Sequence, residues 1–162
     1  MKKNLYVDIV YLIILAATFG AVMVLGILVA PVVFNTENIV VEVIIDRYNA
    51  GMIMSEVFNR FCNWLYIVAF VVLTYEAIKY KFGEYDKFLK VGTFLVVFSS
   101  LMFSGVYAPK ILAMQDIGRE ATQSDTFAAI HLASEIDFKI LAVGLLVLFI
   151  RRLMILSKCK AT

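Results

Sequence analysis

The sequence predicts an all-α integral membrane protein in which four transmembrane helices form a four-helix bundle. Of its 162 residues, 62% are hydrophobic and only 17% are charged, whereas soluble domains have roughly 45–50% apolar residues. The mean hydropathy is +0.89. Four apolar stretches, each long enough for a span of about 20 residues, take up most of the chain. This pattern excludes a water-soluble fold and leaves no room for a separate soluble catalytic domain, so residues 1–162 are expected to form a single membrane domain.

The four predicted spans are long and continuous. No residue from Ile9 to Thr36 is charged at neutral pH, so the first span is much longer than the apolar core of a signal peptide and is expected to remain in the mature protein. Runs such as Ile67 to Leu73 do not alternate as barrel strands do, and helices satisfy their backbone groups locally in lipid. The predicted spans cover about residues 9–34, 51–75, 88–108 and 127–150.

Basic residues gather on one side of this layout. Ten lie near the chain ends or between the second and third spans, whereas the opposite loops hold three basic residues and six acids. The positive-inside rule places the first group in the cytoplasm. We therefore expect a protein of a bacterial-type inner (plasma) membrane with both termini cytoplasmic. The ten residues are Lys2, Lys3, Lys79, Lys81, Lys87, Lys90, Arg151, Arg152, Lys158 and Lys160.

Two similar hairpins indicate an internal duplication. The first and third spans both end in Ala-Pro, at Pro31 and Pro109, and the second and fourth both begin with Ser-Glu, at Ser55 and Ser134. The offset is 79 residues for the Ser-Glu motif and 78 for Ala-Pro. Because equivalent spans point the same way, we expect two parallel hairpin repeats, over about residues 6–80 and 86–152, related by an axis along the membrane normal.

The second and fourth spans carry ionisable residues at matching positions of the repeat. Within each span these residues step by four, so they follow one helix face. A charge at mid-membrane costs at least about 2.5–3.5 kcal/mol, so such residues usually face the bundle interior and pair. We therefore predict a buried polar cluster, open toward the outer side of the membrane. Its members are Glu56, Arg60, His131, Glu135 and Lys139.

Three interpretations of this cluster stay open. It is a structural clasp that fixes helix register, or it lines a cavity for a proton, an anion or a small ligand. Alternatively, the pairs lie at the membrane interface and their long side chains reach the headgroups. Nearby, Asp137 lies about 200° around the helix from Glu135 and has no assignable partner.

His131 is the single histidine, and Met52 is its counterpart in the first repeat. Across a pseudo-two-fold axis, His and Met are a plausible axial pair for the iron of haem b, or ligands for copper. The plainer interpretation is that His131 bonds to Glu135 one turn away and that Met52 packs in the core. No paired histidines, paired cysteines or Cys-x-x-Cys-His motif supports a metal. The cofactor is therefore unknown, with haem b and copper as candidates.

Glycine and proline in the odd spans predict helix packing and helix ends. Small residues at four-residue spacing, such as Ala16 and Gly20, allow close helix approach. Proline removes a backbone donor and clashes with the preceding turn, so it ends or kinks a helix. The expected packing residues are Gly20, Gly26 and Gly105, and the expected helix ends are Pro31 and Pro109.

The chain has an Ala-Pro-x-x-Phe motif that ends at Phe34, the pair Ala50-Gly51 and a His-x-x-Ser element that begins at His131. Together with further segments, these motifs resemble a known membrane-protein family, named domain of unknown function 4149. It includes relatives of the human transmembrane protein 205 and is distantly similar to the copper-resistance D group. The resemblance covers most of the chain and implies a four-helix membrane protein, with a hint of metal or drug resistance. After the His-x-x-Ser element the chain has Asp137 and Lys139 where members tend to have Asn. The segments are Phe19–Phe34 with its Ala-Pro-x-x-Phe motif, Ala50-Gly51, Phe58-Asn59-Arg60-Phe61 and His131-Leu132-Ala133-Ser134.

Function is therefore expected to be non-enzymatic. The polar cluster favours binding or transport of a small ligand or metal, or a role as accessory subunit of a membrane complex. The alternative is a haem-binding oxidoreductase resembling the four-helix protoporphyrinogen oxidase, although its paired His and Lys pattern is missing. The sequence has no phosphate-binding loop, nucleophile elbow or zinc-binding motif. It therefore does not favour a hydrolase, a nucleotide-binding protein or a zinc enzyme. Expected partners are the lipid bilayer and a homo-oligomer or larger membrane complex, with no nucleic acid.

Overall fold

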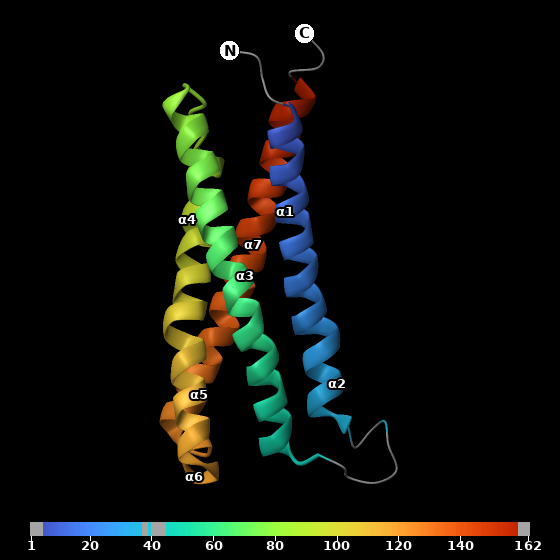
Figure 1. The fold of residues 1–162 in the computed structure, drawn as a ribbon, viewed down its shortest axis with the longest axis vertical. Coiled ribbons are helices and arrows are strands. Elements are labelled where there is room, and N and C mark those ends of the chain that lie inside the picture. The colour runs from blue at the N-terminus through green and yellow to red at the C-terminus, as the bar shows by residue number, and fades with distance from the viewer. Residues whose placement is uncertain (1–4, 37–38, 40–44, 159–162) are drawn as a thin grey trace.

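The protein is all-helical throughout the part that the structure describes. The computed structural model describes residues 5–36, 39 and 45–158, and no strand occurs among them. Four helical segments are long and apolar enough to cross a membrane, which confirms the predicted number of long apolar helices, and each extends beyond the predicted apolar stretch (Figure 1). The segments are Leu5–Phe34, Arg47–Lys81, Lys87–Ile117 and Asp125–Ser157.

The first and third segments are each interrupted by a π-helical turn, whereas the second and fourth are continuous. The first consists of α1 (Leu5–Met23), η1 (Val24–Val29) and α2 (Ala30–Phe34), and the third of α4 (Lys87–Met102), η3 (Phe103–Tyr107) and α5 (Ala108–Ile117). The second is α3 (Arg47–Lys81), and the fourth is α7 (Asp125–Lys158), which follows the short helix α6 (Arg119–Thr122).

Each proline follows a π-helical turn. Pro31 and Pro109 both lie at the start of the helix after that turn. Because the helix is already locally widened there, the chain accommodates a residue that lacks an N–H. The prediction that Pro109 ends its helix is wrong, since α5 continues to Ile117, whereas Pro31 does lie close to the helix end at Phe34. A π turn before Ala-Pro in both odd spans agrees with the duplication, which itself stays a prediction.

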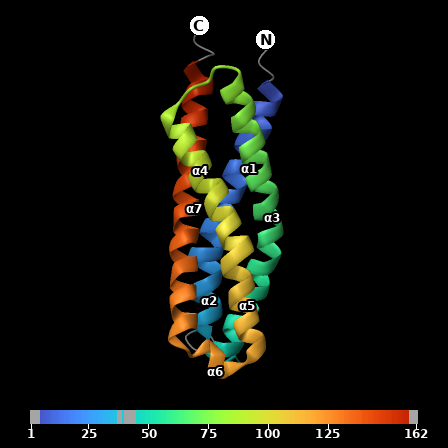
Figure 2. The same cartoon turned by 90° about the vertical axis from the view of Figure 1, so that its left-hand side faces the viewer.

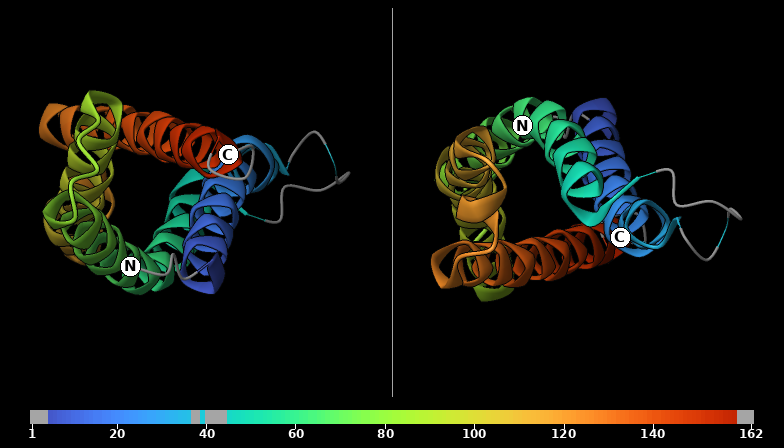
Figure 3. Two further views of the ribbon diagram at one scale, coloured as in Figure 1. Left: turned by 90° about the horizontal axis from the view of Figure 1, so that it is seen from above. Right: turned by 90° about the horizontal axis from the view of Figure 1, so that it is seen from below.

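The helices surround one core in the order α1, α3, α4, α7, and α7 packs back against α1 (Figure 3). Consecutive spans run in opposite directions, so α1 begins, α7 ends and the α3–α4 connection passes at the same end of the bundle (Figures 1 and 2). We call this end the Leu5 end. The opposite end, where α2 ends and α7 begins, is the Phe34 end.

The tightest packing is between α4 and α7. A Cβ added to Gly92 would lie 2.9 Å from Leu148, and one added to Gly144 would lie 3.2 Å from the backbone nitrogen of Val96. These glycines, and not the predicted ones, permit close helix approach. A Cβ at Gly20 or Gly26 would meet nothing within 4 Å, and one at Gly105 would make only an ordinary 3.5 Å contact with Tyr66. The packing prediction for those three is therefore wrong, because their faces do not approach another backbone.

The first span contributes to the core over only half of its length. Its buried residues follow a three-and-four spacing through α1 and end at Val22. No residue of η1 or α2 is buried. The first span is therefore held to the bundle near the Leu5 end, while the half near the Phe34 end presents most of its surface to the surroundings. The buried residues of α1 are Asp8, Tyr11, Leu15, Thr18 and Val22.

Candidate functional site

The predicted polar residues of α3 lie on an exposed helix face. Glu56 and Arg60 pair with each other one turn apart, with Arg60 Nε 2.7 Å from Glu56 Oε1. Their side chains are 54% and 81% exposed, respectively. Together with Met52 they border an open apolar groove of about 420 Å³, whose other lining residues are Ile53 and Val57. We call Met52, Glu56 and Arg60 the α3 stripe.

The equivalent residues of α7 are arranged in the same way. Glu135 lies between His131 and Lys139, 3.3 Å from His131 Nδ1 and 3.9 Å from Lys139 Nζ. The three side chains are between 42% and 76% exposed. His131 also stacks on Phe127, with ring centroids 5.9 Å apart. We call His131, Glu135 and Lys139 the α7 stripe.

The prediction that this cluster is buried is wrong for the single chain, because its side chains are exposed. The four-residue spacing was correct, and both acids bond within their own helix. On α3, however, the core-facing stripe includes Met54 and Leu65, and at 100° per residue Glu56 lies about 200° around the helix from Met54. Helix periodicity defines a face but not its rotation toward neighbouring helices, so the stripe points outward.

The structure supplies no further ligands for a metal at His131. Within residues 5–36, 39 and 45–158, no group of three or more His, Cys, Asp or Glu side chains is placed to hold a metal ion. Met52 is 38% exposed, and the near neighbours of His131 are Phe127 and Glu135. The haem b or copper site at His131 and Met52 therefore stays a prediction to which the geometry adds no support.

A buried charge network lies at the Leu5 end, where sequence reasoning did not place a site. Its centre is Arg152, whose side chain is 3% exposed. The guanidinium donates from Nε and Nη2 to the two carboxylate oxygens of Glu76, at 2.9 and 2.5 Å, and from Nη1 to Glu84. Tyr11 donates to Glu76 Oε1 at 2.8 Å. One cation of α7 thereby holds α1, α3 and the α3–α4 connection together.

A second branch of the network is built on Asp8, which is 1% exposed near the start of α1. Its Oδ1 accepts a hydrogen bond from the Tyr75 hydroxyl at 2.5 Å and lies 2.6 Å from Lys79 Nζ. The Tyr75 ring stacks on that of Tyr11, with centroids 3.7 Å apart, and lies under the Arg152 guanidinium. The two branches share this aromatic pair. The buried charge network comprises Asp8, Tyr11, Tyr75, Glu76, Lys79, Glu84 and Arg152.

Asp86 extends the polar contacts at this end into the α3–α4 connection. As N-cap of α4 it accepts hydrogen bonds from the backbone of Phe88 and Leu89. It also accepts from Arg151, at 2.9 Å from Nε and 2.5 Å from Nη2. The Arg151 guanidinium, followed by these backbone donors, holds the pKa of the Asp86 carboxyl below its usual value. The connection is therefore fixed to α7 by a charged pair.

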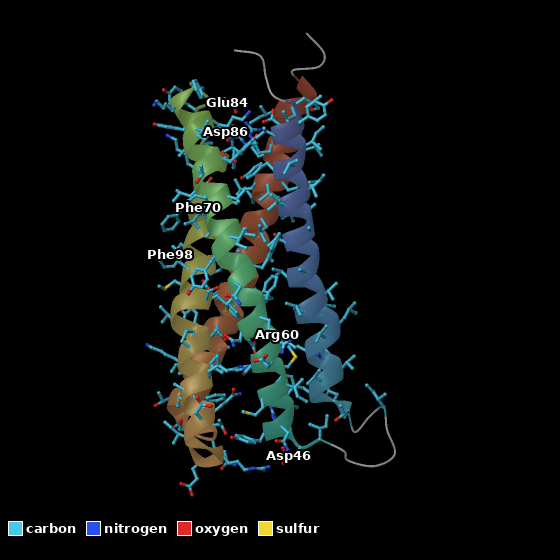
Figure 4. All side chains as sticks on the ribbon, viewed as in Figure 1. Asp46, Arg60, Phe70, Glu84, Asp86 and Phe98 are labelled. Atoms are coloured by element: carbon cyan, nitrogen blue, oxygen red, sulfur yellow. The ribbon has the colours of Figure 1, made fainter. Side chains whose placement is uncertain are left out.

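The Phe34 end has a smaller, exposed link. Asp46 caps α3 through Asn49 and pairs with Arg119, and the Asn49 backbone donor, then Arg119, lowers the pKa of the Asp46 carboxyl. Tyr48 donates to the backbone of Gln115 at 3.0 Å. These contacts join α3 to α5 and α6. Figure 4 shows Asp46 at this end, Arg60 in the same half of the bundle, and Glu84 and Asp86 at the opposite end.

The sequence held a signal for the buried network. Asp8 and Glu76 are acids within helices whose neighbouring residues are mostly apolar, and Lys79 and Arg152 lie at the same membrane side by the positive-inside rule. Their position predicts the orientation of the chain in the membrane, but it does not show that Lys79 pairs with Asp8 or that Arg152 pairs with Glu76. The predicted interior pairs, by contrast, are local i,i+4 contacts, which sequence spacing finds easily.

These features define the class: an all-helical protein with four helices that are long and apolar enough to span a membrane, and with charged groups at two levels of the bundle. The chain belongs to the family described as domain of unknown function (DUF4149), whose model matches residues 13–120. This confirms the family resemblance. No curated protein and no solved structure matches the chain, and the likeness to transmembrane protein 205 and the copper-resistance D group stays a prediction. The match ends before α7, so α7 is interpreted from its own geometry.

Proposed function

We propose that this protein is a non-enzymatic subunit of a membrane assembly, inserted in the inner membrane with both termini cytoplasmic, and that the α3 and α7 stripes are its contact surfaces. One observation carries the proposal: four charged side chains inside candidate spans are exposed, up to 81% at Arg60. The structure of a single chain leaves these charges uncovered, and a partner that covers them explains their position.

The length of the spans supports this interpretation. On α7 only the eleven residues 140–150 separate Lys139 from Arg151, which places the two residues about 18 Å apart along the helix. The hydrocarbon core of a bilayer is about 30 Å thick. With Arg151 at one surface, Lys139 and Glu135 therefore lie at the level of the lipid tails. A charge in that position costs at least about 2.5–3.5 kcal/mol unless it is paired or hydrated.

Charge complementarity indicates what the partner presents. α3 and α7 run in the same direction (Figure 1), and each stripe has its acid one turn before its base. Between two copies, the acid of one stripe therefore meets the base of the other on a diagonal, across a rise of about 6 Å. A homo-oligomer meets this requirement, and so does a larger complex whose other subunit carries buried polar groups. The exposed half of the first span, from η1 to α2, adds an apolar surface beside these charges.

Photo-crosslinking in native membranes tests the proposal. A crosslinker at Val57, in the groove beside the α3 stripe, should give an adduct of defined mass, whereas one at Phe70, which is 71% exposed on the same helix, should not. Twice the 18.3 kDa of the chain identifies a homodimer, and another mass identifies a different subunit. Glu56→Gln with Arg60→Gln should abolish the adduct, and Lys81→Gln at the exposed helix end should leave it intact. Equal labelling from Val57 and Phe70, or none from Val57, contradicts the proposal.

A further inference from the structure

Asp137 is a buried acid without an ionic partner. It lies on the core face of α7 and is 6% exposed. Among the ion pairs of the described residues, none includes Asp137, and its Oδ2 is buried with no hydrogen-bond partner. Buried carboxylates in native proteins normally have such partners. An ion pair, which explains the buried acids at the Leu5 end, therefore does not explain why the Asp137 carboxyl is buried.

Hydroxyl and apolar groups surround this carboxyl. Ser99 of α4 is its polar neighbour, and Ser99 Oγ is likewise buried without a partner. Phe138, the next residue along α7, packs against three other rings and so keeps water away from this level of the core. The centroid distances from Phe138 are 5.3 Å to Phe58, 6.2 Å to Phe61 and 5.1 Å to Phe103.

No charged side chain of the described residues pairs with Asp137; at this level α3 carries Glu56 and Arg60, which are exposed and pair with each other. On the α4–η3 segment the nearest charged residues are Lys90 and Lys110, about 13 and 16 Å along the helix from Ser99, and the tyrosine between them is Tyr107. The charge of α1 is Asp8, at the far end of that helix, and it pairs with Lys79. On α3, Glu56 pairs with Arg60 on the exposed face, and Cys62 is a buried thiol of the hydrophobic core. On α5 and α6 the groups are Asp116, Arg119 and Glu120, and on α7 itself His131, Glu135 and Lys139 lie on the exposed face.

We propose that Asp137 is a proton-binding site in the core of the bundle and that it is occupied at neutral pH. A charged, unpaired carboxylate costs far more to bury than a neutral carboxyl. A proton on the carboxyl makes it a hydrogen-bond donor, and Ser99, its polar neighbour, has a hydroxyl that can accept. A divalent cation fits poorly, because Ca²⁺ and Mg²⁺ take six or more oxygen ligands, whereas this site has one carboxylate and one hydroxyl.

Infrared spectroscopy of the whole protein in lipid vesicles tests this site, because a protonated carboxyl has a carbonyl band distinct from that of a carboxylate. At pH 7 the wild-type protein should show this band, and Asp137→Asn should lose it. Asp125→Asn, which removes an exposed aspartate from the same helix, should retain it. Absence of the band from the wild-type protein at pH 7, or its persistence in Asp137→Asn, overturns the proposal.

If Asp137→Asn fails to fold, a second measurement tests whether an aspartate of the wild-type protein carries the proton. Carbon-13 labelling of aspartate should shift the band in the wild-type protein. Ser99→Ala removes the acceptor, so the labelled band should move to higher frequency. A band that responds to neither the label nor Ser99→Ala contradicts a proton held between these two residues.

Discussion

The two ends of the bundle differ in the burial of their charged side chains and in the partners of these side chains. At the Leu5 end, Arg152 is 3% exposed and is bonded to acids of two other elements. Toward the Phe34 end, Arg60 is 81% exposed and is bonded to an acid one turn away on its own helix. A buried network between helices holds their relative positions, whereas a local exposed pair adds little to them. We infer that the Leu5 end maintains the fold and that the stripes are available for contacts outside it.

The largest expected effect is the loss of the central cation. Arg152→Met leaves the buried Glu76 without its ionic partner and Glu84 with only Lys79, and breaking a buried ion pair costs about 3–5 kcal/mol. Lys139→Met, at the exposed cation of the α7 stripe, breaks no contact between helices and should destabilise the fold much less than Arg152→Met does. Denaturant unfolding in detergent micelles measures both. Equal effects of the two substitutions would remove the distinction between the two regions.

The Asp8 branch should have the next largest effect. Asp8→Asn removes the nearer acid partner of Lys79 and leaves only Glu84, 3.9 Å away, so it is expected to cost about 1–3 kcal/mol. Tyr75→Phe removes only the hydrogen bond to Asp8 and should cost about 1 kcal/mol. Both values come from unfolding of the purified protein. A cost for Tyr75→Phe that exceeds that of Asp8→Asn would contradict this order within the branch.

The Asp86–Arg151 pair predicts a dependence of stability on pH. Because the folded-state pKa of Asp86 is lowered, its contribution is present above the unfolded-state value of about 3.9 and disappears as the pH falls through the lower folded-state pKa. Asp86→Asn keeps a capping side chain and should cost about 1 kcal/mol or less at neutral pH. The difference in unfolding free energy from wild type should shrink below about pH 4. A difference that grows with acidification would contradict the assigned sign.

The smallest effect is expected for the α3 stripe in the isolated chain. A double-mutant cycle of Glu56→Gln and Arg60→Gln should give a coupling much smaller than that of a buried ion pair, because the pair is exposed and lies within one helix. A structural clasp would give a much larger value. Measuring the same cycle in native membranes sharpens the comparison, because coverage by a partner should raise the coupling there.

Residue spacing along one helix predicts the charged pairs of the candidate site, but it does not predict their exposure or the buried charge network. The pairs Glu56–Arg60 and Glu135–Lys139 follow from four-residue steps along single helices. Their exposure does not, because it depends on how far each helix is rotated about its own axis. Arg152 looked like the charged end of a span, yet its contacts with Glu76 cross 76 residues of chain. Only the closing of α7 against α1 and α3 brings them together.

The sequence by itself determined the number of helices, their approximate bounds and the positions of the charges along them. These properties follow from local hydropathy and from the need to satisfy backbone groups within each helix. The tertiary structure alone decided which charges are buried, that Gly92 and Gly144 carry the close packing, and that Asp137 faces the core beside Ser99. The physical reason is that these properties depend on the order and rotation of whole helices, which residue spacing along one helix does not specify.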